Sequence, residues 1–323
     1  MTFCFVYLGS KQMRDTMRNS NVLPESPKLN NLSDFDREFP NEQACRDMFE
    51  KIRWNGKIIC PHCKSDKTSK FKNGKLYWCK ACSKQFTVRV KTIFEDSALP
   101  LRKWFYAIYL LTSRKKGLSS VQLGKDIGVT QKTAWFMLHR IRYAVRTRSL
   151  EKPLEGTVEV DETFVGGKSH GFGRGYCQPN KTAVFGMKQR DGIVRAQTVA
   201  RANRKNILPI IGDSVSPDAT IMSDEFQVYA GLKYEFKNHE VVIHSKKEYV
   251  RGNVHTNGIE SFWALFKRGY VGTYHWMSRK HLDKYIDEFE YRMNSKGLSD
   301  AERFATTFSF VEGRLTYNQL ISE

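Results

Sequence analysis

The sequence predicts an α/β protein, in which a mixed sheet with flanking helices follows a small metal-stabilised module and a helical segment. Two Cys-x2-Cys pairs lie within residues 60–82, and a basic, amphipathic helical pattern covers residues 99–147. Beyond residue 156, three strand-like runs come in succession, and helix-like and strand-like runs then alternate. Successive strands followed by this alternation are typical of a mixed sheet covered by helices.

Positive charge is concentrated in one block of the chain. The 323 residues carry a formal net charge of +19, and residues 51–150 hold 23 Lys and Arg against 4 Asp and Glu. The block therefore accounts for the whole excess, whereas an ordinary solvated surface would spread it out. Charge gathered in this way favours a polyanionic partner, and we expect nucleic acid. An acidic protein or an anionic membrane surface is the alternative.

The N-terminal region predicts neither a membrane span nor a secretion signal. No apolar run approaches the roughly 20 residues that cross a bilayer, and the opening MTFCFVYLGS has no basic residues before its apolar stretch. Residues 1–38 are polar and irregular, so we expect a flexible extension there. An odd number of cysteines, seven in all, also favours a reducing compartment, and we expect the cytoplasm.

Residues 39–95 predict a zinc ribbon. Cys60 and Cys63 are followed, after fifteen residues, by Cys79 and Cys82. Each Cys-x2-Cys turn can aim two thiolates at one tetrahedral ion, and this spacing is typical of a structural zinc site. Because so short and basic a module has little core, one Zn²⁺ would supply its folding free energy. Thiols with a redox role or with no special role are the alternative.

Residues 96–150 predict a helix-turn-helix segment that binds DNA. An amphipathic helix is expected in LPLRKWFYAIYLLTS, a second from Ser119 or Ser120 to Gly128, and a third after Thr130. In such a motif one helix braces the next, whose first residues reach base edges in the major groove. A plain three-helix bundle is the alternative. The predicted DNA-binding residues are Gln131, Lys132 and Thr133 at base edges, together with Arg140 and Arg142.

Residues 151–323 predict the α/β part of the chain. The turn between the second and third strands is expected at Asp191 and Gly192, a favoured hairpin pair. Helices are expected over 203–214, 257–269 and 279–294, with a short one near 225–231. The expected strands are 157–165, 181–189, 192–200, 219–224 and 239–244.

Acidic residues stand where the first of these strands should be buried. The run TVEVDETFVGG contains Asp161 and Glu162, and a buried carboxylate without a partner is costly unless it binds a metal ion. Because neighbouring strand residues face opposite ways, Glu162 should point away from Asp161. Asp224 ends ATIMSD, where a strand gives way to a turn. Glu260 begins a predicted helix, and Lys267 lies almost two turns further on the same face.

These motifs resemble a known family. VEVDETFVGG, MSDEFQVY and HTNGIESFWALFKRG resemble the insertion-sequence transposases of the DDE superfamily. They are most similar to the bacterial subgroup that carries an N-terminal zinc ribbon and is related to the eukaryotic Merlin elements. FPNEQACRDMFEKIRWNGKIICPHC and TIFEDSALPLRKWFYAIYLLTSRKKGLSS resemble the same subgroup, so the likeness covers about residues 39–310.

The resemblance implies a ribonuclease H-like catalytic core and a set of metal ligands. Asp161, Asp224 and Glu260 would hold two Mg²⁺ or Mn²⁺ ions, since carboxylate oxygens suit these hard cations. Lys267 would contact a DNA phosphate near the cut. Related sequences vary between Glu and Asn at the third ligand, so Asn257 is the alternative to Glu260. Asn257 could instead be the N-cap of its helix.

The implied function is that of a DNA transposase. Such a protein binds the terminal inverted repeats of its insertion sequence, cleaves phosphodiester bonds and joins the ends to target DNA. Because the reaction brings two ends together, we expect a homodimer or a larger assembly on DNA, associated with the nucleoid. One alternative is a domesticated, catalytically silent regulator that keeps the zinc ribbon and the helix-turn-helix, and another is a nuclease that cuts without joining.

Overall fold

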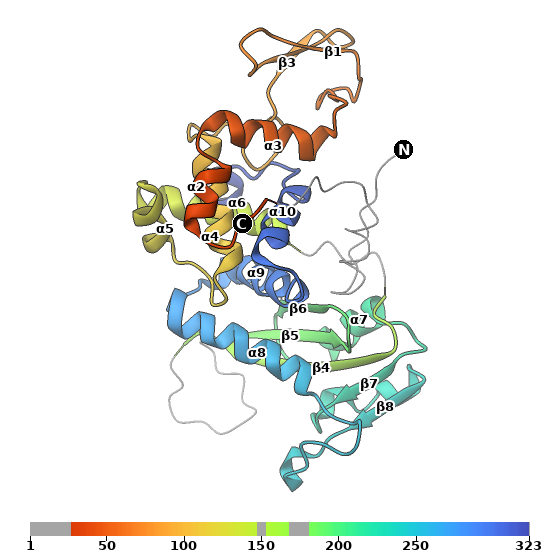
Figure 1. Ribbon diagram of the computed structural model, residues 1–323. Coiled ribbons are helices and arrows are strands. Elements are labelled where there is room, and N and C mark those ends of the chain that lie inside the picture. Colours follow the sequence, from red (N-terminus) through yellow and green to blue (C-terminus); the bar gives the residue numbers. More distant parts are fainter. Residues whose placement is uncertain (1–26, 147–152, 168–180, 323) are drawn as a thin grey trace. The chain divides into compact units, whose positions relative to one another are not determined.

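The computed structural model describes residues 27–146, 153–167 and 181–322 (Figure 1). The chain forms two compact units. We call residues 27–145 with 298–322 the ribbon–helix unit, and the described part of residues 146–297 the sheet unit. This division differs from the predicted domain boundaries in two respects. Residues 298–322 group with the N-terminal part of the chain, and the ribbon and the helical segment belong to a single unit.

The ribbon–helix unit begins before the predicted boundary at residue 39. Helix α2 (Leu32–Glu38) starts at the N-cap Asn31, whose side chain accepts a hydrogen bond from the backbone N–H of Asp34. Phe35 is fully buried, and its ring lies 4.1 Å from that of Tyr106. The prediction of a flexible extension over residues 1–38 was thus wrong for this helix, because its apolar face fills a core formed by distant residues. Residues 1–26 of that prediction lie outside the described residues.

The ribbon is a small antiparallel sheet that follows helix α3 (Glu42–Trp54). Its strands are β1 (Thr68–Lys70), β2 (Tyr77–Cys79) and β3 (Lys84–Phe86). The rings of Tyr77 and Phe86 stack at 5.4 Å, and that of Trp54 meets Tyr77 at 5.0 Å. This aromatic cluster is the apolar core beneath the cysteine pairs.

Three helices follow the ribbon, as predicted: α4 (Leu101–Ser113), α5 (Ser120–Ile127) and α6 (Gln131–Val145). Ser119 is the N-cap of α5, and Gly128 ends it in the left-handed conformation, so the expected cap residues are confirmed. The C-terminal helices α10 (Asp300–Ser309) and α11 (Tyr317–Ser322) complete this unit. Phe304 and Phe308 of α10 pack among the aromatic side chains of α2 and α4.

The sheet unit is built on five strands in the order β6-β5-β4-β7-β8. The three strands that come first along the chain pair antiparallel, whereas β7 and β8 run parallel to β4. Among the described residues this confirms the mixed sheet that the sequence predicted. The strands are β4 (Thr157–Val165), β5 (Thr182–Gln189), β6 (Val194–Val199), β7 (Thr220–Ser223) and β8 (Asn238–Val241).

Helices cover both faces of this sheet. Helix α7 (Arg204–Ser214), which connects β6 to β7, packs on one face, where Val158 and Val160 of β4 are fully buried. Helices α8 (Asn257–Gly269) and α9 (Leu282–Asn294) pack on the other, and Figure 1 shows α8 lying across the strands. The remaining turns are η2 (Gln227–Tyr229), η3 (Leu232–Tyr234), η4 (His244–Lys246), η6 (Arg279–His281) and the π-helical η5 (Tyr270–Tyr274).

Candidate active site and metal centre

Three separate elements of the sheet unit bring the predicted carboxylates together. Asp161 lies on the central strand β4, and Asp224 directly follows the end of its parallel neighbour β7. The two strands pair with Thr157 opposite Thr220, so continuing that register places the two aspartates side by side. Glu260 lies in the first turn of α8, on the face of the sheet that α8 covers.

All three acids line one cavity of about 640 Å³. Its lining combines these acids with two lysines, Lys181 and Lys267. Lys267 and Glu260 line the same cavity, which agrees with the prediction that they share one face of α8. The lining residues are Asp161, Glu162, Thr163, Phe164, Lys181, Asp224, His244, Tyr249, Thr256, Glu260 and Lys267.

The acids of this cavity destabilise one another when they are charged. Burial raises the pKa of Asp161 to about 8, with further contributions from the charges of Glu162, Asp224 and Glu260. Burial also raises the pKa of Asp224, against the hydrogen bond that its side chain accepts from the backbone N–H of Phe226. Clustered carboxylates of this kind are stabilised in the charged form by a bound cation, and carboxylate oxygens are the donors that Mg²⁺ and Mn²⁺ prefer. Their oxygens are not gathered as closely as the ribbon thiols, which are the only such group within 4.8 Å of one another among the described residues.

Glu162 has a different environment from that of Asp161. Its carboxylate accepts a hydrogen bond of 2.6 Å from the hydroxyl of Tyr229, which lies in η2 and is buried with the α7 face of the sheet. Burial raises the pKa of Glu162 to about 7, although the bond from Tyr229 opposes this shift. The predicted alternation of Asp161 and Glu162 is consistent with this contact, yet both residues line the cavity.

The third ligand has two predicted candidates, and the structure treats them differently. Glu260 lines the cavity and accepts a hydrogen bond of 2.8 Å from the hydroxyl of Thr256. Asn257 is exposed and is not part of the cavity lining. The interpretation of Asn257 as a helix N-cap was wrong, because the N-cap is Thr256 and Asn257 is the first residue of α8.

Glu159 is a functional candidate that the sequence analysis did not identify. It lies two residues before Asp161 on β4, and its side chain is only 1% exposed. One carboxylate oxygen accepts a hydrogen bond of 3.0 Å from the backbone N–H of Ile259, in the first turn of α8. The other accepts one of 3.0 Å from Arg190 and lies 3.5 Å from the His255 ring. Glu159 therefore joins the strand of Asp161 to the helix of Glu260.

Two glycines allow α8 to approach the sheet at this point. A Cβ on Gly258 would lie 2.7 Å from the carboxylate of Glu159. A Cβ on Gly186, which pairs with Asp161 across β4 and β5, would lie 2.6 Å from the ring of Trp263. Both distances are too short for a carbon atom, so glycine at these positions sets the separation of helix and strands. In the sequence, Glu159 and Asp161 are acids at alternating positions of one strand. This pattern does not reveal that α8 is the helix that Glu159 contacts.

The four predicted thiols of the ribbon lie within 4.8 Å of one another. The Sγ atoms of Cys60 and Cys82 are 3.7 Å apart, and those of Cys63 and Cys79 are 3.5 Å apart. A tetrahedral ion with Zn–S bonds of about 2.3 Å needs edges of about 3.8 Å. The cluster therefore has both the donors and the spacing of a structural zinc site.

Each cysteine pair is shaped by the same turn. The backbone N–H of Lys64 donates to the carbonyl of Cys60, and that of Ser83 donates to the carbonyl of Cys79, both at 2.9 Å. Lys64 and Ser83 are also both left-handed, with φ of 62° and 52°. Equivalent turns present the two pairs of thiols to the same point, as the spacing predicted.

The predicted DNA-binding residues in the first turn of α6 differ in exposure. Gln131 and Lys132 are exposed at the start of the helix. Thr133 is half-buried, and its backbone N–H donates to the hydroxyl of Thr130, as the expected cap requires. The Lys132 ammonium also lies over the ring of Tyr317 in α11, at 5.3 Å. These positions agree with a recognition helix whose first turn faces outward.

Arg140 and Arg142 were wrongly predicted to contact DNA. Arg140 is 4% exposed, donates a hydrogen bond of 2.5 Å to the carbonyl of Glu95, and lies over the Trp104 ring at 5.3 Å. Arg142 is 1% exposed. Their charge suggested a surface role, but long-range contacts within the folded chain bury these side chains.

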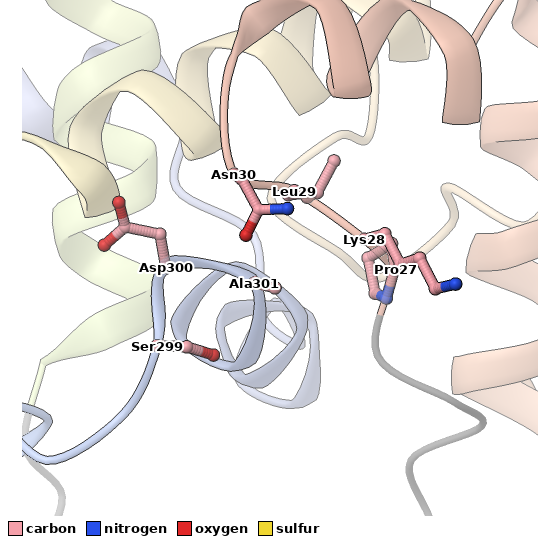
Figure 2. Close-up of a pocket in the computed structure, with 7 residues that line it drawn as sticks. All are labelled: Pro27, Lys28, Leu29, Asn30, Ser299, Asp300 and Ala301. Carbon is pink, nitrogen blue, oxygen red and sulfur yellow. The ribbon is translucent and has the colours of Figure 1, made fainter.

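A second cavity, of about 320 Å³, lies in the ribbon–helix unit. It is formed by residues 27–30 before α2 and residues 299–301 at the start of α10 (Figure 2). Its one acid, Asp300, pairs with Arg303 at 3.0 Å. This lining lacks the grouped carboxylates of the sheet unit, so the candidate active site is the acidic cavity.

Across the described ranges, the helices are too short or too polar to span a bilayer.

Comparison with sequence families gives two matches. The ISXO2-like transposase domain matches residues 153–294, and a transposase zinc-ribbon domain matches residues 40–85. These ranges cover the candidate active site and the cysteine cluster.

Two relatives are similar to the chain itself. An uncharacterized protein in transposable element ISH50 of Halobacterium salinarum is 30% identical over 276 residues, which are 79% of this chain and 92% of that protein. An uncharacterized transposase-like protein of Haemophilus influenzae is 29% identical over 97 residues, 30% of this chain and 77% of that protein.

Among solved structures, the Mos1 strand transfer complex is matched over 69% of this chain and 82% of that chain, at 12% identity. Its TM-score of 0.28 is too low to establish a shared fold.

Proposed function

The chain belongs to the family of DNA transposases with an ISXO2-like domain, and we propose that it cleaves and joins DNA at Asp161, Asp224 and Glu260. The observation that supports this site is the convergence of three acids, from β4, the end of β7 and the start of α8, on one cavity. Burial and mutual repulsion raise the pKa of two of these acids, Asp161 and Asp224. An arrangement that is costly without a cation is expected where the cation serves the reaction.

In this proposal each group of the cavity has a separate task. Asp161, Asp224 and Glu260 would hold two divalent cations, which would activate the attacking oxygen and stabilise the leaving one. Thr256 orients Glu260 through its hydrogen bond. Lys181 and Lys267 would attract the phosphate to the cavity and hold it by charge. Glu159 fixes the start of α8, and therefore the position of Glu260, relative to β4.

The ribbon–helix unit would supply DNA binding. Gln131 and Lys132 are exposed at the start of α6, where a helix-turn-helix protein reads base edges, and Thr133 follows them. The cysteine cluster would hold one Zn²⁺ and thereby stabilise the ribbon. Terminal inverted repeats and target DNA would be the partners. A dimer or a larger assembly would bring two ends together, and the mass of the protein–DNA complex in solution tests this point.

The experiment that tests the proposed site is a cleavage and joining assay with Mg²⁺ on the DNA that flanks this gene. We expect wild type to cut at the element ends and join them, whereas Asp161→Ala and Asp224→Ala should bind the ends without cutting. Asp213→Ala, which removes an exposed aspartate of α7, is the matched control and should cut normally. Full cutting by the Asp224→Ala protein would refute the site.

The same assay separates the remaining alternatives. A silent DNA-binding regulator would bind the ends, and neither wild type nor any variant would cut them. A nuclease on the same fold would release cut ends without joined products. The raised pKa values of Asp161 and Asp224, both half-buried, favour the active enzyme over the regulator, since clustering these acids carries a cost that binding by the ribbon–helix unit does not require.

A further inference from the structure

The acidic cavity has an aromatic rim that the proposed metal and phosphate contacts do not use. Tyr249 lines the cavity, yet 60% of its surface is exposed. Its ring lies 5.3 Å from that of His244, which also lines the cavity. Tyr249 therefore offers an accessible aromatic face at the cavity, against which a planar group can pack.

The segment that carries Tyr249 is held firmly beside Asp224. Ser245 of η4 donates hydrogen bonds from its backbone N–H and its hydroxyl to the two carboxylate oxygens of Glu225, at 3.0 and 2.8 Å. Glu225 is the residue next to Asp224, so the turn that bears His244 is fixed to the loop that bears a candidate metal ligand. The position of the rim is therefore coupled to that of the acids.

Ion pairs and a tight turn hold the other side of the segment. Arg251 pairs with Glu240 of β8 at 3.1 Å and with Glu248 at 3.4 Å. Lys247 is left-handed, with φ of 60°, and turns the chain toward Tyr249. Because these ion pairs are exposed and weak, the hydrogen bonds of Ser245 are the main anchor of the turn that presents the ring. An anchored turn lowers the entropic cost of using the ring in binding.

The charges around this ring suit a nucleic acid strand. Lys246 and Lys247 are exposed on the same segment, and Lys181 and Lys267 line the cavity. A strand that places a phosphate among the acids and lysines of the cavity would bring a neighbouring base to its rim. An aromatic ring beside a basic track is the usual platform on which an unpaired base stacks.

We propose that Tyr249, backed by His244, stacks on one nucleobase next to the phosphate that enters the acidic cavity. The ligand is thus an unstacked base of the DNA end or of the target strand. This inference rests on the proposed function, since it requires DNA in that cavity. It adds a contact that is independent of the metal ligands and of the helix-turn-helix.

The test measures whether the effect of Tyr249 depends on a base in the DNA. The full-length protein binds a pre-cut end duplex taken from the DNA that flanks this gene, and affinity is read by fluorescence anisotropy. The duplex is compared with versions that carry an abasic site at each nucleotide flanking the cut. Tyr249→Ala should bind the intact duplex about 5- to 150-fold more weakly than wild type. With the abasic site at the stacked position, the same substitution should have almost no effect.

Two further variants keep the interpretation sharp. Tyr249→Phe retains the ring and should bind like wild type. Tyr234→Ala removes another exposed tyrosine of the sheet unit, 81% exposed and not part of the cavity lining, and should also bind like wild type. A loss of affinity in Tyr249→Ala that is equal on intact and abasic duplexes would overturn the inference. So would a Tyr249→Phe protein as weak as Tyr249→Ala, since that would indicate a hydroxyl contact.

Cutting is measured separately on uncut duplexes, so the two proposals can fail independently. If wild type cuts normally but Tyr249→Ala loses no base-dependent affinity, the stacking inference is wrong and the proposed site stands. If Tyr249→Ala loses base-dependent affinity but wild type does not cut, the stacking contact stands and the proposed chemistry is wrong.

Discussion

Replacement of Glu159 tests whether a buried carboxylate fixes the geometry of the acidic cavity. In Glu159→Ala, the backbone N–H of Ile259 loses the acceptor at the start of α8, and Arg190 loses the partner of its ion pair. Loss of a helix cap costs about 0.5–2 kcal/mol, and removal of one partner from a buried ion pair costs about 3–5 kcal/mol. Because Arg190 is 23% exposed and can regain water, and because such costs are not additive, we expect a loss of about 3–4 kcal/mol in the free energy of unfolding.

Glu159→Gln separates the charge of this residue from its shape. The amide oxygen can still accept from Ile259, so we expect a smaller loss, of about 1–2 kcal/mol. Glu155→Ala, which removes an exposed acid just before β4, is the control and should change stability by less than about 0.5 kcal/mol. Urea unfolding followed by circular dichroism measures all three changes.

A second substitution makes this test specific to the contact between the strand and the helix. Gly258→Ala should destabilise wild type, since the new Cβ would meet the Glu159 carboxylate at 2.7 Å. In a Glu159→Ala background the same change should cost clearly less, because the obstructing carboxylate is gone. Mg²⁺ affinity, measured by calorimetry, should fall in Glu159→Ala as Glu260 loses its fixed position. Unchanged stability in Glu159→Ala, or equal costs of Gly258→Ala in both backgrounds, would refute this reasoning.

Three other predictions follow from the charges and the cysteine cluster. In metal-free protein the raised pKa of Asp161 favours the protonated form in the folded state, so its contribution to stability is fully present below about pH 4 and is lost as the pH rises toward 8. Wild type should therefore lose more stability than Asp161→Asn between pH 5 and 8, by at most about 1.4 kcal/mol per pH unit, and parallel pH curves would contradict this. Elemental analysis should find one zinc per chain, and chelation or Cys63→Ser should alter the tryptophan fluorescence, to which Trp54 contributes beside the ribbon. A natively folded protein without zinc would contradict the zinc site. Lys132→Ala should weaken DNA binding and reduce the slope of log affinity against log salt concentration by about one, without loss of stability. Arg140→Ala should instead lower the unfolding temperature. The opposite result for the two variants would contradict their assigned roles.

Local signals in the sequence were enough to locate most elements of the fold. The strand that carries Asp161 was predicted over the residues that form β4, since its apolar alternation and closing glycines are local features. Ser119 and Gly128 marked the ends of α5 for the same reason, because a cap acts on its own helix. The spacing of the cysteines likewise determined how the ribbon folds, as each pair forms its own turn.

The errors concern contacts between residues that are far apart in the sequence. Arg140 carries a charge and lies in a basic block, but the carbonyl of Glu95 and the Trp104 ring hold it inside. The role of Glu159 depends on Ile259, one hundred residues later. The helix α10 that carries Phe304 and Phe308 was not predicted, and its apolar side completes a core formed by residues some two hundred positions earlier. The hydrophobic periodicity of a sequence indicates which face of a helix or strand is apolar. It does not indicate which other element packs against that face.

The return of the chain end to the ribbon–helix unit has a consequence for protein synthesis. Phe304 and Phe308 lie in the same aromatic core as Phe35 and Phe105, so this core stays incomplete until the ribosome has passed α10. A product that ends early, through a nonsense codon or a frameshift, would carry the predicted recognition helix on an unfinished core. We therefore expect truncated copies to be degraded instead of competing with the full-length protein for element ends. Decayed copies of such an element would then fall silent without inhibiting intact ones in the same cell.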